Sequence, residues 1–250
     1  MIVIRSLAYQ LIFLSWTTII SISCLPLLAI ASRHTMQNIA TFWIKICFFL
    51  QRKILQMSFE IRGIDNLPHG SVIIAAKHQS IWDTMIFHHL LTDPAYIFKK
   101  ELLFVPIIGW YLQKTGQIPI DRNGGIKALK LMINMTRHAV TNQQQIVIFP
   151  EGHRQLPGIT GTYHSGVAML YKSLKIPVVP VALNSGLFWC RQTFLRYPGV
   201  ITLEILPALP DNIERKTLMK VLQDQIEIAT YTLEKEALQR FSYLNCLISH

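Results

Sequence analysis

The chain is short of charged residues, and this shortage argues against an ordinary soluble domain. Charged side chains make up 15% of its 250 residues, whereas a typical soluble domain carries about 25%. Hydrophobic residues reach 51%. We therefore expect the protein to contact a phospholipid membrane.

Cysteine is also scarce, and the four that occur, Cys24, Cys47, Cys190 and Cys246, lie far apart without a C-x-x-C pair. This spacing favours free thiols over a zinc site or a disulfide framework. The sequence also lacks the H-E-x-x-H, P-loop and G-x-S-x-G motifs, which disfavours metalloprotease, nucleotide-hydrolysing and serine-hydrolase chemistry. We predict no metal site and no bound cofactor.

Acidic residues are few, since 14 Asp and Glu face 24 Lys and Arg, which gives a formal net charge of +10. Such a balance indicates an anionic partner: lipid headgroups, a phosphorylated substrate, an acidic carrier protein or nucleic acid. Nucleic acid is the weakest of these, because the chain has no zinc-finger spacing, no RNA-recognition motif and no dense basic run. We predict no nucleic-acid partner.

The N-terminal stretch Ser6–Ser32 is almost wholly apolar, with Gln10 its only strongly polar residue. About 20 apolar residues cross a bilayer, so this stretch is long enough to span one. A cleaved signal peptide is the rival interpretation, because Arg5 supplies a positive start and Ala29-Ile30-Ala31 resembles a cleavage site. The apolar core exceeds the usual 7–15 residues, which favours an uncleaved anchor.

A second apolar stretch, Ile39–Met57, is interrupted by cations and fits an interfacial helix, the second arm of a helical hairpin or an ordinary core helix. We therefore predict membrane-anchoring helices over residues 1–57. Positive charge is in excess after the first segment, because only Arg5 precedes it while four cations follow it. This excess predicts that the following domain lies on the cytoplasmic face of the membrane. The cations after it are Arg33, Lys45, Arg52 and Lys53.

Residues 58–250 alternate short β-branched runs with longer helical patterns, which predicts one α/β domain with a mixed or largely parallel sheet flanked by helices. The expected strands are Ser58–Arg62, Ser71–Ala76, Ala95–Phe98, Gln117–Ile120, Gln145–Phe149, Val178–Leu183 and Val200–Leu206. The expected helices are Ile81–Leu91, Ile126–Val140, Ser165–Leu174 and Ile213–Leu238.

The last expected helix carries charged residues among its apolar positions, and we interpret them as a solvated face. They are Lys216, Lys220, Asp224, Glu227, Glu234 and Lys235.

His78 follows an expected buried strand, at the kind of strand end where sites in open α/β sheets collect. An unperturbed imidazole has a pKa of about 6.5 and is mostly neutral near pH 7, so a histidine here suits a general base. Asp83, five residues on, is the candidate orienting partner. On one continuous helix the two side chains would diverge by about 140°. They meet only if His78 lies in the turn before the helix and Asp83 in its first turn, with Ser80 as the N-cap.

The same stretch has a purely structural interpretation. Ser80-x-x-Asp83 fits the capping-box pattern, and in this interpretation Asp83 serves only the helix start while His78 is an ordinary loop residue. This stretch by itself does not separate the two interpretations.

Three further stretches follow in order: Gly116–Arg122 (GQIPIDR), Phe149–Arg154 (FPEGHR) and Val178–Leu183 (VVPVAL). With the H-x-x-x-x-D element first, they resemble the four blocks of the glycerolipid acyltransferases, in particular those that act on 1-acyl-sn-glycerol-3-phosphate. Four ordered blocks over roughly residues 70 to 185 are far more specific than any one motif. Two positions depart from the family pattern: His153 replaces a threonine, and Pro119 replaces a bulky apolar residue.

The resemblance implies an acyltransferase of phospholipid biosynthesis. His78 and Asp83 would be catalytic, and a fatty acyl group would pass from acyl-CoA or acyl carrier protein to the sn-2 hydroxyl of lysophosphatidic acid, giving phosphatidic acid. Two alternatives stay open: a remodelling acyltransferase with another lysophospholipid headgroup, and an inactive membrane-anchored lipid-binding protein.

The acceptor's phosphate needs cationic partners, and Arg122 and Arg154 each follow an expected strand. If those strand ends are neighbours, both guanidinium groups converge near His78. Gly152 would let the backbone approach an oxyanion, Glu151 would fix an arginine or bond the glycerol, and Lys100 would add positive potential at the rim. Solvated loop arginines and a membrane-facing lysine are the alternatives.

Overall fold

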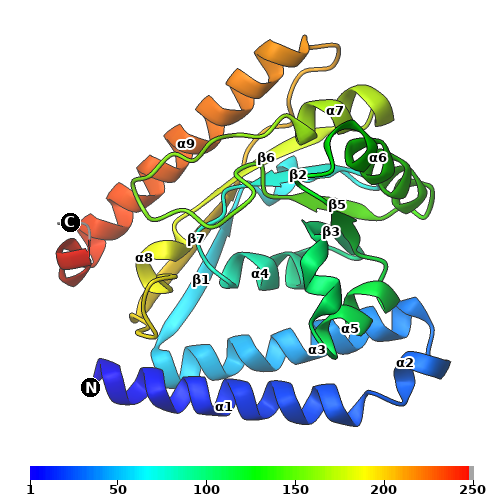
Figure 1. Cartoon of the computed structure of the whole chain (residues 1–250). Coiled ribbons are helices and arrows are strands. Elements are labelled where there is room, and N and C mark those ends of the chain that lie inside the picture. Colours follow the sequence, from blue (N-terminus) through cyan, green and yellow to red (C-terminus); the bar gives the residue numbers. More distant parts are fainter. Residues whose placement is uncertain (248–250) are drawn as a thin grey trace.

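The strands form one mixed, mostly parallel sheet in the order β1-β7-β6-β2-β5-β3-β4 in the computed structural model, which describes residues 1–247 (Figure 1). Only the β6–β7 pair among these strands is antiparallel. The strands are β1 (Met57–Arg62), β2 (Ile73–Ala76), β3 (Pro94–Lys99), β4 (Ile118–Ile120), β5 (Gln145–Ile148), β6 (Val178–Leu183) and β7 (Gly199–Ile205).

The helices of the α/β part agree with the sequence pattern to within two residues at each end. They are α4 (Trp82–Leu90), α6 (Gly125–Thr141), α7 (Gly166–Leu174) and α9 (Arg215–Arg240). Two short helices, α5 (Ile108–Lys114) and α8 (Ser185–Phe188), were not expected. The fold class that the sequence predicts is therefore confirmed.

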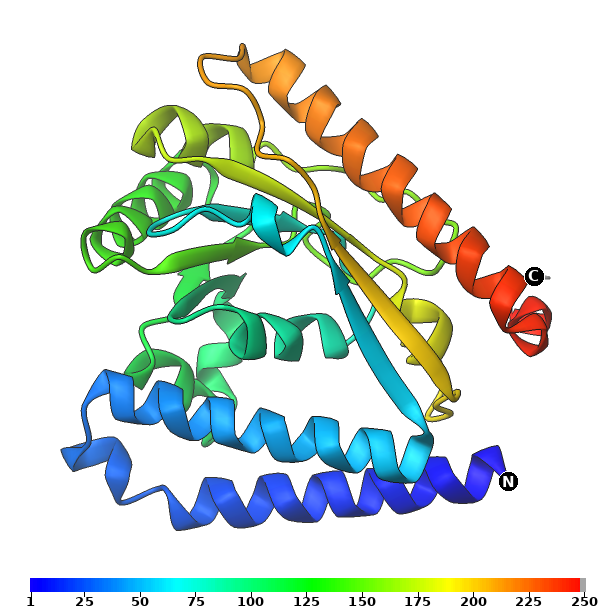
Figure 2. The ribbon, with the colours of Figure 1, turned by 180° about the vertical axis from the view of Figure 1, so that it is seen from behind.

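Side chains alternate between two cores, one on each face of the sheet. Along β2, Ile74 belongs to the core beneath α4, whereas Ile73 and Ala75 belong to the core beneath α6, α7 and α9. This period of two is what a strand imposes, because successive side chains point to opposite faces. Figure 2 shows the helices covering both faces of the twisted sheet.

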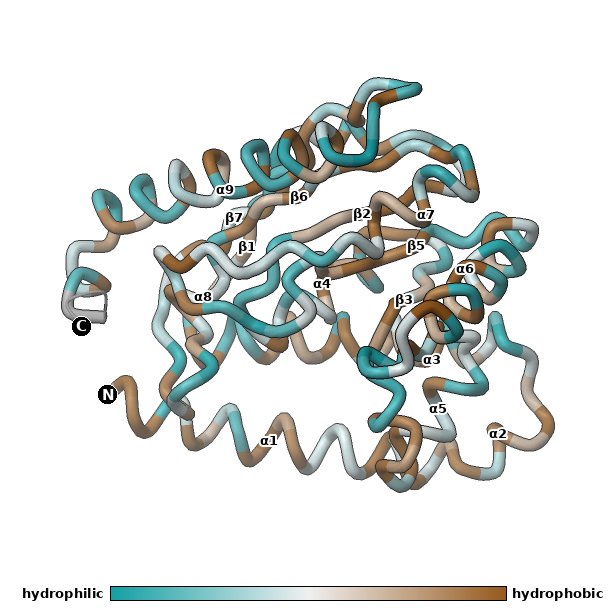
Figure 3. Tube along the Cα trace, turned by 45° about the horizontal axis from the view of Figure 1, so that its top comes forward, coloured by the Kyte–Doolittle hydropathy of each residue, from teal (hydrophilic) through white to brown (hydrophobic). Residues whose placement is uncertain are grey.

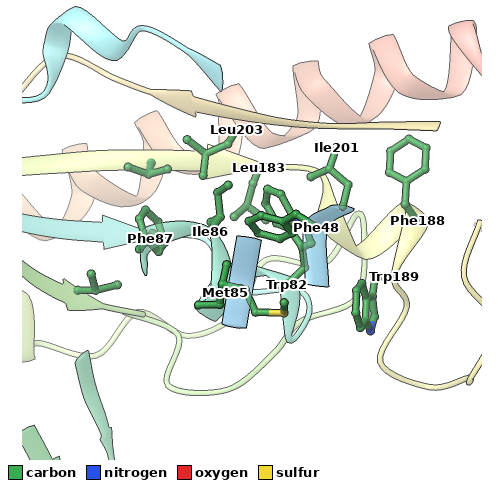
Figure 4. Close-up of a cluster of buried hydrophobic side chains, with 14 of the residues drawn as sticks. Phe48, Trp82, Met85, Ile86, Phe87, Leu183, Phe188, Trp189, Ile201 and Leu203 are labelled. Carbon is green, nitrogen blue, oxygen red and sulfur yellow. The ribbon is translucent and has the colours of Figure 1, made fainter. Parts of the chain in front are cut away.

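Large aromatic and aliphatic side chains interlock in the core on the α4 side of the sheet (Figure 4). Trp82, Ile86 and Phe87 of α4 are wholly buried there, together with Phe188 of α8 and the strand residue Leu203. Burying a large apolar side chain stabilises a fold by about 1.5–3 kcal/mol. This core therefore fixes the start of α4, where Asp83 lies.

The N-terminal helices form an antiparallel hairpin that lies below the sheet in Figure 1. Helix α1 (Ile2–Ser23) ends before Pro26, the short α2 (Leu27–Ile30) follows, and α3 (Arg33–Leu50) returns along α1 and continues into a π-helical turn, Gln51–Leu55. Trp43 Nε1 of α3 donates to Thr17 Oγ1 of α1 across 3.1 Å.

One face of this hairpin belongs to the sheet's own core. Tyr9, Ile44 and Phe48 are buried in the cluster that includes α4, and the Tyr9 ring packs edge-on against Trp189 at 5.7 Å between centroids. The opposite face is apolar and exposed, and Figure 3 shows hydrophobic segments along α1. Within residues 1–247, α1 is the only helix long and apolar enough to cross a membrane.

Candidate active site

His78 lies in the turn between β2 and α4, where the parallel strands end. β2 ends at Ala76 and α4 begins at Trp82, so Asp83 falls in the first turn of the helix. His78 Nδ1 and Asp83 Oδ2 are 3.0 Å apart. Because an ionised carboxylate only accepts hydrogen bonds, Nδ1 carries the proton and the lone pair is on Nε2. The two side chains therefore meet as the spacing argument requires.

The Asp83 carboxylate is wholly buried and surrounded by donors. Its Oδ2 also accepts from the backbone N–H groups of Gln79 at 2.6 Å and Ser80 at 2.8 Å. Its Oδ1 accepts from the hydroxyl groups of Ser80 at 3.0 Å and Ser185 at 2.5 Å. Four donors besides the imidazole fix the plane of the carboxylate.

Ser80 is not the N-cap of α4, which corrects the sequence-based expectation. The residue before the helix is Ile81, which makes no side-chain cap. Asp83 nevertheless accepts the Ser80 N–H, which is the acidic half of a capping box. The structural and functional interpretations of this stretch are therefore compatible, since one carboxylate holds both the turn and the histidine.

The imidazole of His78 is held on its flat side by Phe149, at the end of β5. The two rings are stacked with centroids 4.0 Å apart and an interplanar angle of 20°. The side chain of His78 is 14% exposed, and no described residue hydrogen-bonds its Nε2. Stacking and the Asp83 bond leave the ring one orientation, with Nε2 available to a substrate hydroxyl.

Arg122 reaches the loop after β5, although the strands before the two predicted arginines are not neighbours. β3 lies between β4 and β5, so the condition of neighbouring strand ends is not met. Gly152 has φ +71°, and a Cβ there would lie 3.7 Å from Arg122 Cζ and 3.2 Å from His164 Cδ2. Glycine thus allows both side chains to lie against the backbone.

The backbone of Arg154 lies beside the turn of residues 77–81 that carries His78. The next residue, Gln155, donates its N–H to the His78 carbonyl at 2.8 Å, and the Arg154 carbonyl accepts from the Arg191 guanidinium. The half-buried Arg154 side chain makes no hydrogen bond with another described residue. His153, the departure from the family pattern, is exposed, and its Nε2 lies 3.1 Å from Gln155 Nε2.

Glu151 has a different surrounding from the one that the sequence predicts. It is wholly buried and contacts neither an arginine nor the opening beside His78. Its carboxylate accepts from Lys77 Nζ at 2.8 Å, from the His78 N–H at 3.2 Å and from the Gly161 N–H at 3.1 Å. With its lone pairs used in this way, Glu151 supports the His78 backbone rather than a substrate.

Lys100 forms an ion pair with Asp121, the residue before Arg122. Its Nζ bonds the Asp121 carboxylate, next to Arg122 in the sequence, and its side chain is 43% exposed. Asp121 therefore neutralises part of the positive charge that Lys100 adds at this rim.

Sequence reasoning missed Ser185, Phe149 and His164 as parts of the site. A signal existed for the first two, because Phe149 directly follows β5 and Ser185 lies two residues after β6. Both strands flank β2 and run parallel to it. Residues after such strands gather at one edge of the sheet. His164 reaches the site by a loop contact with no periodic signature.

Residues 1–247 contain no group of three or more His, Cys, Asp or Glu side chains that could hold a metal ion. The thiols of Cys24, Cys47 and Cys190 are free, and the side chain of Cys246 lies outside the described residues.

Comparison with known proteins gives consistent matches. The model of the family described as "Acyltransferase" matches residues 58–184. A 1-acyl-sn-glycerol-3-phosphate acyltransferase of Pseudomonas aeruginosa is 32% identical over 196 residues, covering 78% of this chain and 74% of that protein. The human 1-acyl-sn-glycerol-3-phosphate acyltransferase alpha is 24% identical over 225 residues, covering 88% and 78%.

A solved structure is similar across almost the whole chain. The crystal structure of the 1-acyl-sn-glycerophosphate acyltransferase of Thermotoga maritima superposes with a TM-score of 0.74 at 20% identity, covering 94% of this chain and 98% of that one. The shared region includes the N-terminal hairpin as well as the sheet, so the likeness of fold is not confined to residues 58–184.

Proposed function

The chain belongs to the acyltransferase family, and on that premise we propose that it transfers a fatty acyl group from an acyl thioester to the sn-2 hydroxyl of 1-acyl-glycerol-3-phosphate, giving phosphatidic acid. The curated relatives that carry this activity in their names support the choice of acceptor.

One observation carries the proposal: His78 is bound through Nδ1 to a buried carboxylate while its Nε2 is open. In the proposed reaction Nε2 takes the proton of the acceptor hydroxyl, and the oxygen attacks the thioester carbonyl. Asp83 stabilises the imidazolium that forms. When the tetrahedral intermediate collapses, the thiolate leaves and takes that proton back from His78, so no covalent enzyme intermediate is needed.

The amides of Gln79 and Ser80 are engaged by Asp83, so the oxyanion needs other donors. Arg122 is a candidate, because it lies against Gly152 on the loop whose Gln155 N–H donates to the His78 carbonyl. The Gly152 N–H itself already donates to the Phe149 carbonyl at 2.9 Å. A preorganised donor at an oxyanion typically contributes about 10²–10³ in rate.

We assign the acceptor's phosphate to Arg122 and Arg154, with Lys100 adding positive potential. A guanidinium forms two parallel bonds to a phosphate, and a phosphomonoester offers the oxygens for two such groups. Arg122 is exposed and reaches Gly152. Arg154 precedes the residue that bonds the His78 carbonyl. Arg154 thus lies on the loop beside the base, and Arg122 lies against the same loop at Gly152.

The acyl donor is acyl-CoA or acyl carrier protein in this proposal, used as a co-substrate without any resident cofactor. Both donors are anionic, and both present the acyl chain on a thioester. The net charge of +10 favours either one.

The membrane is the natural source of the lipid acceptor, and the N-terminal hairpin provides the contact. Ile4, Leu11 and Phe42 on the hairpin are more than half exposed, as are Phe104 and Trp110 before and within α5. In Figure 1 these helices occupy one end of the molecule. We propose that this apolar end embeds in the bilayer, with the α/β part on the cytoplasmic face.

The test is transfer by the purified full chain. Lysophosphatidic acid is offered in mixed vesicles with palmitoyl-CoA or palmitoyl-acyl carrier protein, and products are identified by mass spectrometry. We expect phosphatidic acid that carries the donor's acyl chain. A lysophospholipid whose phosphate is masked as a diester is offered in parallel. Transfer only to that acceptor contradicts the proposed acceptor, and absence of transfer with both donors contradicts the proposed reaction.

A further inference from the structure

A cluster of four ionisable side chains lies buried directly behind the catalytic turn. Its centre is Lys77, which is 1% exposed. Lys77 Nζ lies 2.8 Å from Glu151 Oε1, 2.8 and 3.0 Å from the two carboxylate oxygens of Glu227, and 3.0 Å from the Ile159 carbonyl. Glu234 completes the group by accepting from Gln79 Nε2 at 2.6 Å and from the Gly158 N–H at 3.0 Å.

Two of these acids come from α9, which is remote in sequence from the catalytic turn. Glu227 and Glu234 are two turns apart on one face of α9, and both lie outside the residues that the family model matches. The expectation that they belong to a solvated face is wrong for both, because Glu234 is 4% exposed and the Glu227 side chain 18%. The hydroxyl groups of Tyr163 and Thr160 also donate to Glu227.

A buried cluster of charged side chains contributes little to the stability of a fold. Desolvation of buried charges often exceeds their mutual attraction, and apolar replacements are commonly neutral or stabilising. Burial raises the pKa of Glu151 and of Glu234 despite their hydrogen bonds. Two carboxylates on the Lys77 ammonium and a third on Gln79 therefore indicate a role other than stability.

The geometry indicates that use. Lys77 and Gln79 flank His78, and successive side chains in an extended segment point to opposite sides. Both flanking side chains are bound by acids of α9, whereas His78 points the other way, to Asp83 and Phe149. The base is thus held between two side chains that α9 fixes from behind.

We propose that Glu227 and Glu234 are positioning residues for the general base: through Lys77 and Gln79 they hold the His78 turn at the place where Nε2 meets the acceptor hydroxyl. The inference rests on the proposed function. Both acids bind the turn on the side opposite the His78–Asp83 pair, so we expect them to act on turnover and to leave substrate affinity unchanged. A displacement of about 1 Å in a catalytic group costs roughly a hundredfold in rate.

The test compares Glu227→Gln and Glu234→Gln with Glu236→Gln in the full chain. Glu236 is a matched control, because it lies on the same helix and forms an ion pair, but with Arg62 at the surface. We expect kcat to fall about tenfold or more in the first two variants, with the KM of donor and acceptor each within about threefold, and no change in the control. Tyr163→Phe, which removes one hydrogen bond from Glu227, should lower kcat by a few-fold and serves if a glutamine variant fails to fold.

A kcat within twofold of the unmodified protein in folded Glu227→Gln and Glu234→Gln overturns the inference. A rise in KM at constant kcat also overturns it, because it assigns the acids to substrate binding.

A second readout does not depend on activity. The Nδ1 proton of His78, followed by NMR of ¹⁵N-histidine-labelled protein and assigned by its loss in His78→Ala, should shift in Glu227→Gln and stay in place in Glu236→Gln. An unmodified protein that transfers no acyl group while this shift occurs contradicts the proposed reaction alone. Normal transfer without the shift contradicts the positioning role alone.

Discussion

Helix α4 has a buried carboxylate at each end, and the two are bound in opposite ways. Asp83 in the first turn binds the imidazole of His78 and four neutral donors. Asp93, just after the helix, binds both ends of the Arg33 guanidinium at 2.6 Å each, with Gln37 at 3.2 Å and Gln144 at 3.3 Å.

Burial does not distinguish the two carboxylates, since Asp83 is 0% and Asp93 8% exposed. Their partners do. An arginine stays protonated and offers only donors, so Asp93 and Arg33 form a closed pair that ties α3 to the start of β3. A histidine gives and takes a proton near pH 7, and His78 has a second nitrogen free of protein partners. The start of α4 is therefore suited to chemistry and its end to stability.

At the start of α4, His78→Ala should cause the largest loss of acyl transfer. Removing the base leaves Asp83 with its neutral donors, so we expect an intact fold and a loss of transfer of about 10⁴-fold. Product formation and a melting curve measure the two effects. Turnover near normal in the folded variant contradicts the base assignment.

Asp83→Asn should lower turnover less than His78→Ala does. An amide holds the turn less well and lets the imidazole take the other tautomer, so we expect turnover to fall by roughly two to three orders of magnitude. Steady-state kinetics and far-UV circular dichroism check this, with Asp93→Asn as the matched control at the other end of the helix. Equal losses of turnover in the two variants would erase the distinction between the two ends.

Arg122→Ala and Arg154→Ala test whether the loops near His78 bind the phosphate. A charge-assisted hydrogen bond contributes about 1.5–3 kcal/mol, so the KM of the acceptor should rise roughly tenfold to a hundredfold while that of the donor changes little. Lysine at either position should restore only part of the loss. An acceptor with its phosphate masked as a diester should be poor for the unmodified protein and less affected by the variants, and equal use of both acceptors contradicts the phosphate assignment.

Replacing His153 by threonine, the residue usual in the family, asks whether this position tunes acceptor choice. His153 is exposed and contacts Gln155 rather than Arg154. We therefore expect the ratio of KM values for masked and unmasked acceptors to change by less than about threefold. A larger change shows that His153 contributes to headgroup choice.

Asp93→Asn should affect stability with kcat unchanged. Arg33 would lose its partner, and the cost is about 1–3 kcal/mol in the free energy of unfolding at pH 7. Desolvation raises the pKa of Asp93, but the hydrogen bonds and charge of Arg33 outweigh it and hold that pKa below its usual value. The stability is therefore present above the pKa of an unfolded aspartate, about 3.9, and is lost as the pH falls through the lower folded value.

Urea unfolding of both proteins at pH 7 and near pH 3 measures this difference. We expect the difference in free energy of unfolding between the unmodified protein and Asp93→Asn to be smaller near pH 3 than at pH 7. A gap that widens on acidification contradicts the assigned role of Arg33.

The strands could be predicted because they carry a local signal. Val178–Leu183 is β-branched, bounded by turn residues, and observed with the same ends. Helix α8 has four residues and no periodic pattern, so no local rule finds it. The His78–Asp83 pair was predictable for the same local reason, since the two residues are five positions apart in one turn.

Contacts over long separations could not be predicted. Glu227 and Glu234 meet the catalytic turn across about 150 residues of sequence separation, and their spacing on α9 is compatible with a solvated face. Lys77, placed after the buried residues Ala75 and Ala76, was the available clue, because a buried lysine needs acidic partners. The sequence does not say which acids these are.

The most direct test of His78 as the base is chemical rescue in His78→Gly, which leaves a space between Phe149 and Asp83 that an imidazole molecule fits. Phosphatidic acid formation is measured against imidazole concentration. We predict background transfer without imidazole and a rise that saturates with it, absent from a matched His138→Gly control. Normal transfer by folded His78→Gly without imidazole would contradict the account.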